Sequence, residues 1–327
     1  MNISDNDHQG VTISSLSETY LSETVLRPPS IRQYRLVVRL FVAVEGDLPI
    51  SKVDRAAVIR FRTEVLARAT AVTFNNYRRH LRTLWNFAVR HQLLTTNPFA
   101  DVRPAPEPRK RKKTITADGL SCALDFLRLE VLKPLSDQKR LKPAWFWLIV
   151  VQLLYATGIR RRQLVELRWG HLDLAQGTLL LVAEGSKNYR EWSVPMPQYL
   201  IEPLAMLKRC TIDLVGTSNI GSHQIFNVTL FNPKYQGDRL TVDHVHAFFR
   251  HLSKATGVRI TPHRLRHTIA TNLANHPCVN MKSVQELLGH TDLRTTLEYY
   301  VETDLEHLRK MIEEVTKETA PQEKLAI

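Results

Sequence analysis

Cysteine is scarce in this chain, which has three among its 327 residues. Cys122, Cys210 and Cys278 lie far apart and are odd in number, so the sequence predicts neither a disulfide framework nor a cysteine zinc site. Long hydrophobic runs are also missing. The longest, from Trp145 to Ala156, is well short of the roughly 20 apolar residues that cross a bilayer. We therefore expect a buried helix there, no membrane partner and a reducing compartment.

Negative charge is in deficit. Lysine and arginine number 45 against 32 acidic residues, which gives a formal charge of +13, and the sequence pI is near 9.8. This imbalance favours a polyanionic partner, nucleic acid first. The start of the chain, Met1 to Asp7, lacks the basic and then apolar order of a signal peptide, so we expect a cytoplasmic protein.

The first hundred residues read as helical throughout. Ser30 can cap one helix, which Gly46 ends, and a further helix begins near Val53. The clearest helix follows Thr70, and its apolar stripe comprises Phe74, Tyr77, Leu81, Leu84 and Ala88.

Arginines accompany this apolar stripe. Arg78, Arg79 and Arg82 lie largely off it, which predicts an arginine ridge beside an apolar face. We expect the ridge to contact DNA phosphates; a charged face in water is the other interpretation.

Residues 101–114 break the helical pattern. Pro104, Pro106 and Pro108 cannot continue a helix, so we expect an extended linker between two domains. Five successive cations follow, and they repel one another unless a counter-charge is present. We predict that they lie along DNA phosphates, with a solvated run as the alternative. These cations are Arg109, Lys110, Arg111, Lys112 and Lys113.

Beyond the linker, helical patterns alternate with short strands. The helices are expected at Ala117–Leu132, Ala144–Ala156, 197–210 and Val242–Ala255. Thr178–Ala183 is strand-like, and Glu191–Pro195 can be its hairpin partner, with Pro195 ending an edge strand. A further short strand is expected at Ile225–Phe231. The predicted fold class is mainly α with a small antiparallel sheet (α+β).

Four motifs in this second half carry polar chemistry. They read A-T-G-I-R at 156–160, H-R-L-R-H-T at 263–268, L-L-G-H-T-D at 287–292 and T-T-L-E-Y-Y at 295–300. Breaking a phosphodiester without a metal needs a nucleophile, fixed cations for the developing charge, and a proton for the leaving oxygen. A tyrosine, two arginines and a lysine meet these needs, because arginine binds phosphate through two parallel hydrogen bonds and lysine has a proton to give.

These motifs resemble those of the tyrosine recombinases (phage integrase family), and the resemblance covers most of the chain. It implies a helical core-binding domain of SAM-like fold over residues 13–100, after a disordered terminus over 1–12. It also implies a basic linker over 101–114 and a catalytic domain over 115–327 that ends in a docking helix. The activity implied is that of a site-specific recombinase or integrase, working through a covalent 3′-phosphotyrosine without metal, ATP or other cofactor.

All six site positions of the family are filled in this sequence. They are Arg160, Lys187, His263, Arg266, His290 and Tyr299. By the resemblance, the two arginines and His290 stabilise the pentavalent phosphate. His263 assists proton movement from Tyr299, the nucleophile, and Lys187 protonates the leaving oxygen.

Three positions leave alternatives open. Gln163 stands where the family commonly has an acidic residue; its amide can still accept a hydrogen bond but brings no charge, so support of Arg160 is weaker. Arg190 is a rival cation in the same turn as Lys187. Tyr300 is the rival nucleophile, although adjacent helical residues point about 100° apart, so only one of the two tyrosines faces the phosphate.

A metal site is disfavoured. His263 and His267 have the i, i+4 spacing of a zinc pair, but Arg264 and Arg266 add positive charge where a dication would sit. His244 and His246 are two positions apart, so they do not share a helix face.

Double-stranded DNA is the expected partner, with four protomers on two paired recombination sites, in the bacterial nucleoid; accessory DNA-bending proteins can assist. A type IB topoisomerase shares the residue set, and a catalytically silent DNA-binding regulator can share the fold. An apolar stripe after the tyrosine favours docking on a neighbouring protomer and hence recombination. Its members are Leu305, Leu308, Met311 and Ile312. The recognition sequence, the host mobile element and the direction of recombination are not encoded in any motif.

Overall fold

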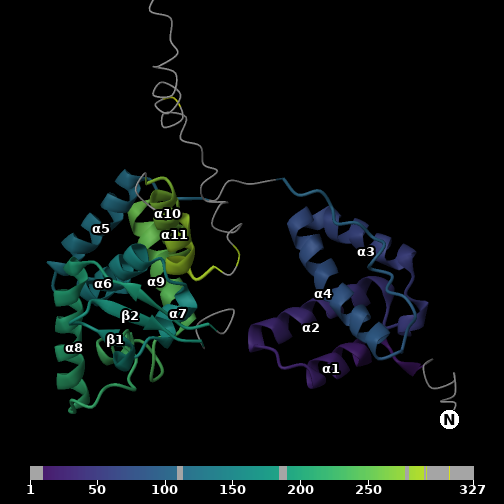
Figure 1. Cartoon of the computed structure of the whole chain (residues 1–327), viewed down its shortest axis with the longest axis horizontal. Helices are drawn as coiled ribbons and strands as arrows, with labels where there is room; N and C mark the ends of the chain where they lie inside the picture. The colour runs from purple at the N-terminus through teal and green to yellow at the C-terminus, as the bar shows by residue number, and fades with distance from the viewer. Residues whose placement is uncertain are drawn as a thin grey trace, which may run out of the picture. The chain divides into compact units, whose positions relative to one another are not determined.

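The computed structural model describes residues 10–108, 113–183, 190–276, 280–290, 292 and 309. The chain forms two compact units, Met1–Lys110 and Arg111–Ile327 (Figure 1). Within the described ranges, no helix is both long and apolar enough to cross a membrane. The fold is mainly α with one small antiparallel sheet, as predicted.

The first unit is built from helices with identifiable start signals. Asp54 Oδ1 accepts the Ala57 N–H at 2.8 Å and begins one helix, and Thr70 Oγ1 accepts the Thr73 N–H at 3.3 Å and begins the next. Such side chains satisfy amide groups that the first turn leaves unpaired. The elements are α1 (Ile13–Glu23), α2 (Pro28–Glu45), η2 (Ile50–Lys52), α3 (Arg55–Arg68) and α4 (Ala71–Arg90).

Two details at the start of this unit correct the predictions. Ser30 lies inside α2, which begins at Pro28, because proline needs no hydrogen-bond acceptor at a helix start. Thr12 was expected in a disordered terminus. Instead it caps α1 through the Ser15 N–H at 3.3 Å and pairs with Pro49.

Aromatic side chains fill the core of the first unit. Phe41 packs edge-on against Phe61 at 5.1 Å between ring centroids, and Trp85 lies 4.8 Å from Phe99. All four rings are fully buried. Val102 also belongs to this core, at 2% exposure, so the unit continues past residue 100.

The linker is tied to each unit by hydrogen bonds. On the side of the first unit, the Asn75 amide donates to Ala105 O and accepts from Ala105 N, both at 2.8 Å. On the side of the second unit, the Ile115 N–H donates to Thr268 Oγ1 at 2.9 Å. Both ends of the linker are therefore fixed on their own unit.

The second unit surrounds one buried helix, α6 (Ala144–Thr157). Its residues are apolar on every side, as a core helix requires, and Phe146, Trp147, Val150 and Leu154 are fully buried. The helices α5 and α10 pack against it. The other helices in the part of this unit that the structure describes are α5 (Ala117–Val131), α7 (Arg161–Glu166), α8 (Ile201–Val215), α9 (Val242–Thr256), α10 (Pro262–Ala274) and α11 (Met281–Leu288). Short 3₁₀ turns are η3 (Lys139–Leu141), η4 (Trp169–His171), η6 (Gln198–Leu200) and η7 (Val228–Leu230).

The sheet has the order β1-β2-β3 and is antiparallel: β1 (Leu172–Asp173), β2 (Thr178–Leu181) and β3 (Trp192–Pro195). In the register, Leu179 faces Val194 and Leu181 faces Trp192. Leu179, Leu181 and Val194 are buried, whereas Leu180 and Ser193 between them are exposed, which is the alternation of a sheet with one covered face. The predicted hairpin with Pro195 on an edge strand is confirmed.

The strand predicted at Ile225–Phe231 is wrong. Ile225, Phe226 and Val228 are buried core residues, but no strand among the described residues pairs with them, and the 3₁₀ turn η7 (Val228–Leu230) forms near the end of the segment. The apolar run there reflects burial of an irregular segment. The Gln224 side chain, just before this segment, satisfies two backbone groups beside it: Nε2 donates to Val165 O at 2.6 Å, and Oε1 accepts from Leu240 N at 2.7 Å.

Candidate active site

The loop that carries Arg160 begins where α6 ends. Gly158 ends α6 in the left-handed conformation at φ +60°, and Arg160 is the N-cap residue of α7. A Cβ on Gly158 would lie 3.1 Å from Ile269 Cγ2 and 3.2 Å from Leu288 Cδ2. Glycine therefore lets α10 and α11 approach the turn that presents Arg160.

Gln163 holds this turn from within α7. Its Oε1 accepts the Arg160 backbone N–H at 2.8 Å, and the side chain is 2% exposed. Its Nε2 has no hydrogen-bond partner among the described residues. The amide thus keeps the capping contact that a carboxylate would make, without adding a negative charge near Arg160.

Arg266 joins three segments of the second unit. Its Nη1 donates to Gly158 O at 2.6 Å, its Nη2 donates to Leu288 O at 2.6 Å, and Nη2 lies 3.0 Å from His290 Nε2. The residue is 3% exposed. Two carbonyl oxygens and an imidazole therefore fix the direction of the buried guanidinium.

His290 follows the left-handed Gly289 at the end of α11. Its N–H donates to Gln285 O, and Gln285 Nε2 donates back to His290 O, both at 3.0 Å. Because a guanidinium has only donors, the His290 Nε2 beside Arg266 is the acceptor and Nδ1 carries the proton.

His263 lies in the first turn of α10, on the exposed surface. Arg266 is three residues further on and therefore on a neighbouring part of the same helix face. The His263 and His267 rings lie 4.7 Å apart between centroids, with their planes tilted by 52°. Among the described residues, no group of three His, Cys, Asp or Glu side chains could hold a metal ion, so this pair has no third ligand there.

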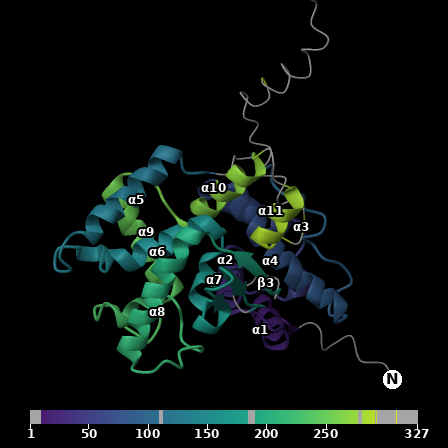
Figure 2. The ribbon, with the colours of Figure 1, turned by 60° about the vertical axis from the view of Figure 1, so that its left-hand side comes forward.

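The structure thus brings the Arg160 turn, Arg266 and His290 together, with His263 on the helix of Arg266; Figures 1 and 2 both show α10 beside α11. Lys187 and Tyr299 lie outside the described residues, as does the rival Tyr300. The strands on either side of the Lys187 loop, β2 and β3, are described and paired.

The predicted DNA-contact residues divide by exposure. Arg79 and Arg82 are exposed on α4, and Lys113 is exposed in the linker, while Arg109–Lys112 lie outside the described residues. Arg78 is 7% exposed, and its Nη2 donates to Phe99 O at 2.9 Å. Burial, and then the charge of Arg82, lower the pKa of Arg78. Arg78 is therefore a core residue of the first unit and not part of the surface ridge.

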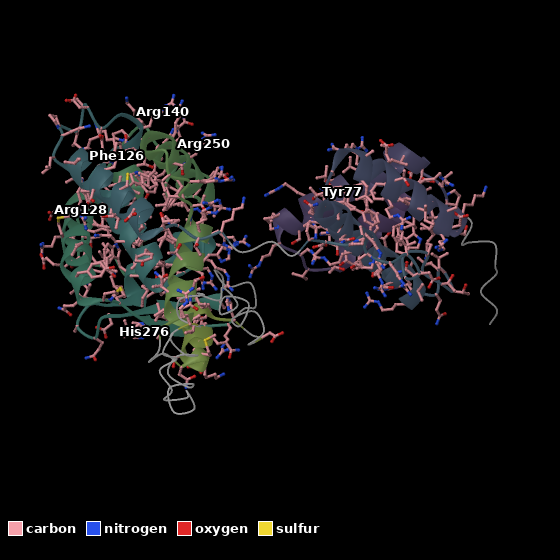
Figure 3. All side chains as sticks on the ribbon, turned by 90° about the horizontal axis from the view of Figure 1, so that it is seen from above. Tyr77, Phe126, Arg128, Arg140, Arg250 and His276 are labelled. Carbon is pink, nitrogen blue, oxygen red and sulfur yellow. The ribbon has the colours of Figure 1, made fainter. Side chains whose placement is uncertain are left out.

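A second group of cations, not singled out from the sequence, lies on α9 and η3. Arg140, Arg250 and Lys254 are exposed around His251, and Figure 3 shows Arg140 and Arg250 near each other. Burial lowers the pKa of His251, and the three cations lower it further. Arg250 and Lys254 are four residues apart on α9, and that spacing was the signal available in the sequence.

The fold and the site define a class of protein: two mainly helical units, the second of which carries a cluster where Arg266 contacts the Arg160 turn and His290. The sequence model of the phage integrase family matches residues 127–307, more than half of the chain. The chain belongs to this family, the tyrosine recombinases.

Two relatives support this assignment. A putative tyrosine recombinase XerC of Pseudomonas syringae is 36% identical over 308 residues, covering 93% of this chain and 64% of the relative. A second, from Pseudomonas aeruginosa, is 33% identical over 309 residues, covering 92% of this chain and 71% of the relative. The chain thus spans about two thirds of the length of these relatives.

Solved structures show the same fold. The Tn1549 transposon integrase, in complex with transposon right end DNA, has a TM-score of 0.71 and 17% identity; 94% of this chain and 100% of that one are covered. A lambda integrase tetramer bound to a Holliday junction has a TM-score of 0.66 and 20% identity, over 90% of this chain and 78% of that one.

Proposed function

We propose that this protein is a site-specific DNA recombinase that cleaves and rejoins strands through a covalent 3′-phosphotyrosine on Tyr299. The observation that carries the proposal is the Arg266 guanidinium, which joins the Arg160 turn to His290. Tyr299 follows His290 by nine positions in the sequence. A fixed cation, an imidazole and a tyrosine hydroxyl are the parts that phosphoryl transfer to tyrosine needs.

The reaction assigns a role to each residue. Arg160 and Arg266 bind the non-bridging oxygens of the scissile phosphate, and His290 stabilises the same group as charge develops. The Tyr299 oxygen attacks phosphorus while His263, on the exposed face of α10, takes the phenolic proton. Lys187 gives a proton to the departing 5′ oxygen. The P–O bond to that oxygen breaks as the bond to Tyr299 forms.

The chemistry is reversible and needs no external energy. The phosphotyrosine bond conserves the energy of the broken phosphodiester, so a 5′ hydroxyl from another strand can reverse the attack without ATP. The donor set is cationic, which suits direct binding of a phosphate in place of a metal-bridged one. We assign no cofactor.

Double-stranded DNA is the proposed substrate, and four protomers on two paired sites are the proposed assembly. Support comes from lambda integrase, described as a tetramer on a Holliday junction, and from the exposed cations Arg79, Arg82 and Lys113. Together with Arg109–Lys112 they would contact phosphates and supply affinity without sequence preference. Accessory DNA-bending proteins can assist, and we place the reaction on DNA in the bacterial cytoplasm.

A nicked duplex that traps the covalent intermediate tests this function. The cognate site is first selected from a pool of random duplexes by binding, and the nick lets the released strand diffuse away so that religation fails. We expect a protein–DNA adduct that survives denaturation and disappears in Tyr299→Phe. Binding with no adduct on any selected site would favour the silent regulator. Relaxation of supercoiled DNA by a monomer, without strand exchange, would favour the topoisomerase.

A further inference from the structure

The turn from Leu287 to His290, which includes the end of α11 and the two residues after it, is contacted from two sides. On one side, Arg266 of α10 donates to Leu288 O at 2.6 Å and contacts His290 Nε2 at 3.0 Å. On the other side lies Trp192, the first residue of β3. Its indole Nε1–H donates to Leu287 O at 3.3 Å.

Trp192 also covers Gly289 at very short range. A Cβ built on Gly289 would lie 2.3 Å from Trp192 Cζ2 and 2.4 Å from its Cη2. The indole ring therefore occupies the space that a side chain at residue 289 would need, and only glycine permits this approach. Gly289 also has φ +60°, which disfavours other residues.

This contact joins parts of the chain that are far apart in sequence. Trp192 belongs to the hairpin whose loop contains Lys187, and Gly289 directly precedes His290. Beside the contact, β3 and α11 leave an open groove of about 520 Å³, lined by Arg190, Pro195 and Leu287 among others. Trp192 thus contacts the end of α11 next to this groove and is one of the residues that line it.

We propose that Trp192 is a positioning residue for the recombinase reaction. Its ring sets the distance between the Lys187 hairpin and the turn from Leu287 to His290, and so holds His290 against Arg266. This role rests on the proposed function, because it concerns the geometry in which that reaction occurs. A displacement of about 1 Å in a reacting group can cost about 100-fold in rate, so a contact of this kind has catalytic consequences.

Three variants separate the two contributions of the indole. Trp192→Ala removes the ring and the donor, and we expect covalent adduct formation at saturating nicked duplex to slow by about 10- to 100-fold. Trp192→Phe keeps an aromatic face on Gly289 but loses the Nε1–H, so we expect less than about a 10-fold loss. Trp145→Ala is the matched control: it is a half-buried tryptophan of the same unit that packs on Phe231. Its adduct rate per bound duplex should match that of the unchanged protein.

A double-mutant cycle tests the contact itself. Gly289→Ala should slow adduct formation strongly, because the new Cβ meets the Trp192 ring. In the Trp192→Ala background the same change should cost clearly less, since only the backbone strain remains. Additive losses would show that Trp192 and Gly289 act independently and would overturn the proposal.

Hydrogen exchange gives a readout that does not depend on activity. The His290 amide donates to Gln285 O, and we expect its exchange to accelerate in Trp192→Ala but not in Trp145→Ala. Unchanged exchange in Trp192→Ala, or an adduct rate equal to that of the unchanged protein, contradicts the positioning role. If the unchanged protein forms no adduct on any selected site, the proposed function fails, while the exchange result still decides whether Trp192 holds the turn.

Discussion

Replacing Arg266 with lysine tests the centre of the site. The guanidinium reaches three atoms at once, Gly158 O, Leu288 O and His290 Nε2, at 2.6, 2.6 and 3.0 Å. A lysine keeps the charge, but it lacks the planar fork of a guanidinium. Its single ammonium nitrogen cannot reach all three acceptors at once.

The expected losses follow from these contacts. A hydrogen bond to a charged group contributes about 1.5–3 kcal/mol, and at least one of the three acceptors would be left buried without its donor. Because lysine recovers part of the loss, we expect Arg266→Lys to lower the free energy of unfolding by about 2–4 kcal/mol. Lysine would also offer the proposed phosphate a single point donor in place of the planar guanidinium, and removing one donor of this kind typically slows the chemical step by about 10²–10³-fold.

The assay has two parts. Urea unfolding reports the stability, and single-turnover adduct formation at saturating nicked duplex reports the chemical step. Arg264→Lys is the matched control on the same helix, because Arg264 makes one longer hydrogen bond, from Nη1 to Arg259 O at 3.3 Å. An Arg266→Lys protein with unchanged unfolding midpoint and adduct rate would refute the view that the bridging guanidinium organises the site.

Three further outcomes are expected. Arg78→Ala should destabilise the first unit by about 1–3 kcal/mol in urea unfolding and leave DNA affinity unchanged. Arg82→Ala should leave the unfolding midpoint unchanged and weaken DNA binding. The reverse pattern would contradict the burial of Arg78 and the exposure of Arg82. Neutralising Arg109–Lys113 should weaken binding to all duplexes and flatten the salt dependence by about 0.9 in log–log slope per lost phosphate contact, and an unchanged slope would identify a solvated linker. Removing the chain after Val301 should preserve single-site binding in a gel-shift assay but impair strand exchange, and normal assembly on paired sites would exclude docking by this segment.

Local patterns predicted most helices of this protein, because core burial and helix capping leave direct marks in a sequence. The apolar run Ala144–Ala156 became the buried helix α6, and Gly46 and Thr70 stand at the helix ends where they were expected. The site residues Arg160, Arg266 and His290 were assigned from the resemblance of their motifs, in order and spacing, to those of the tyrosine recombinases. Their contacts confirm that the three segments meet.

The wrong predictions arose because a charged residue was assumed to lie on the surface, and because contacts between distant segments leave no local pattern in the sequence. Arg78 is four residues after Phe74 and three before Leu81, so helical spacing places it on the buried face, although its charge suggested the surface. The run Ile225–Phe231 is apolar because it packs into the core, and no local feature separates this case from a strand. Trp192 and Gly289 meet across 97 positions of sequence, and neither residue signals the other.

The most direct test of the account concerns the identity of the nucleophile. Tyr299→Phe removes only the phenolic oxygen, so we expect DNA binding close to that of the unchanged protein and no covalent adduct on a nicked cognate duplex. Tyr300→Phe should bind and form the adduct normally. Adduct formation by Tyr299→Phe, with none by Tyr300→Phe, would reverse the assignment, and adducts from both variants would contradict a tyrosine mechanism at this position.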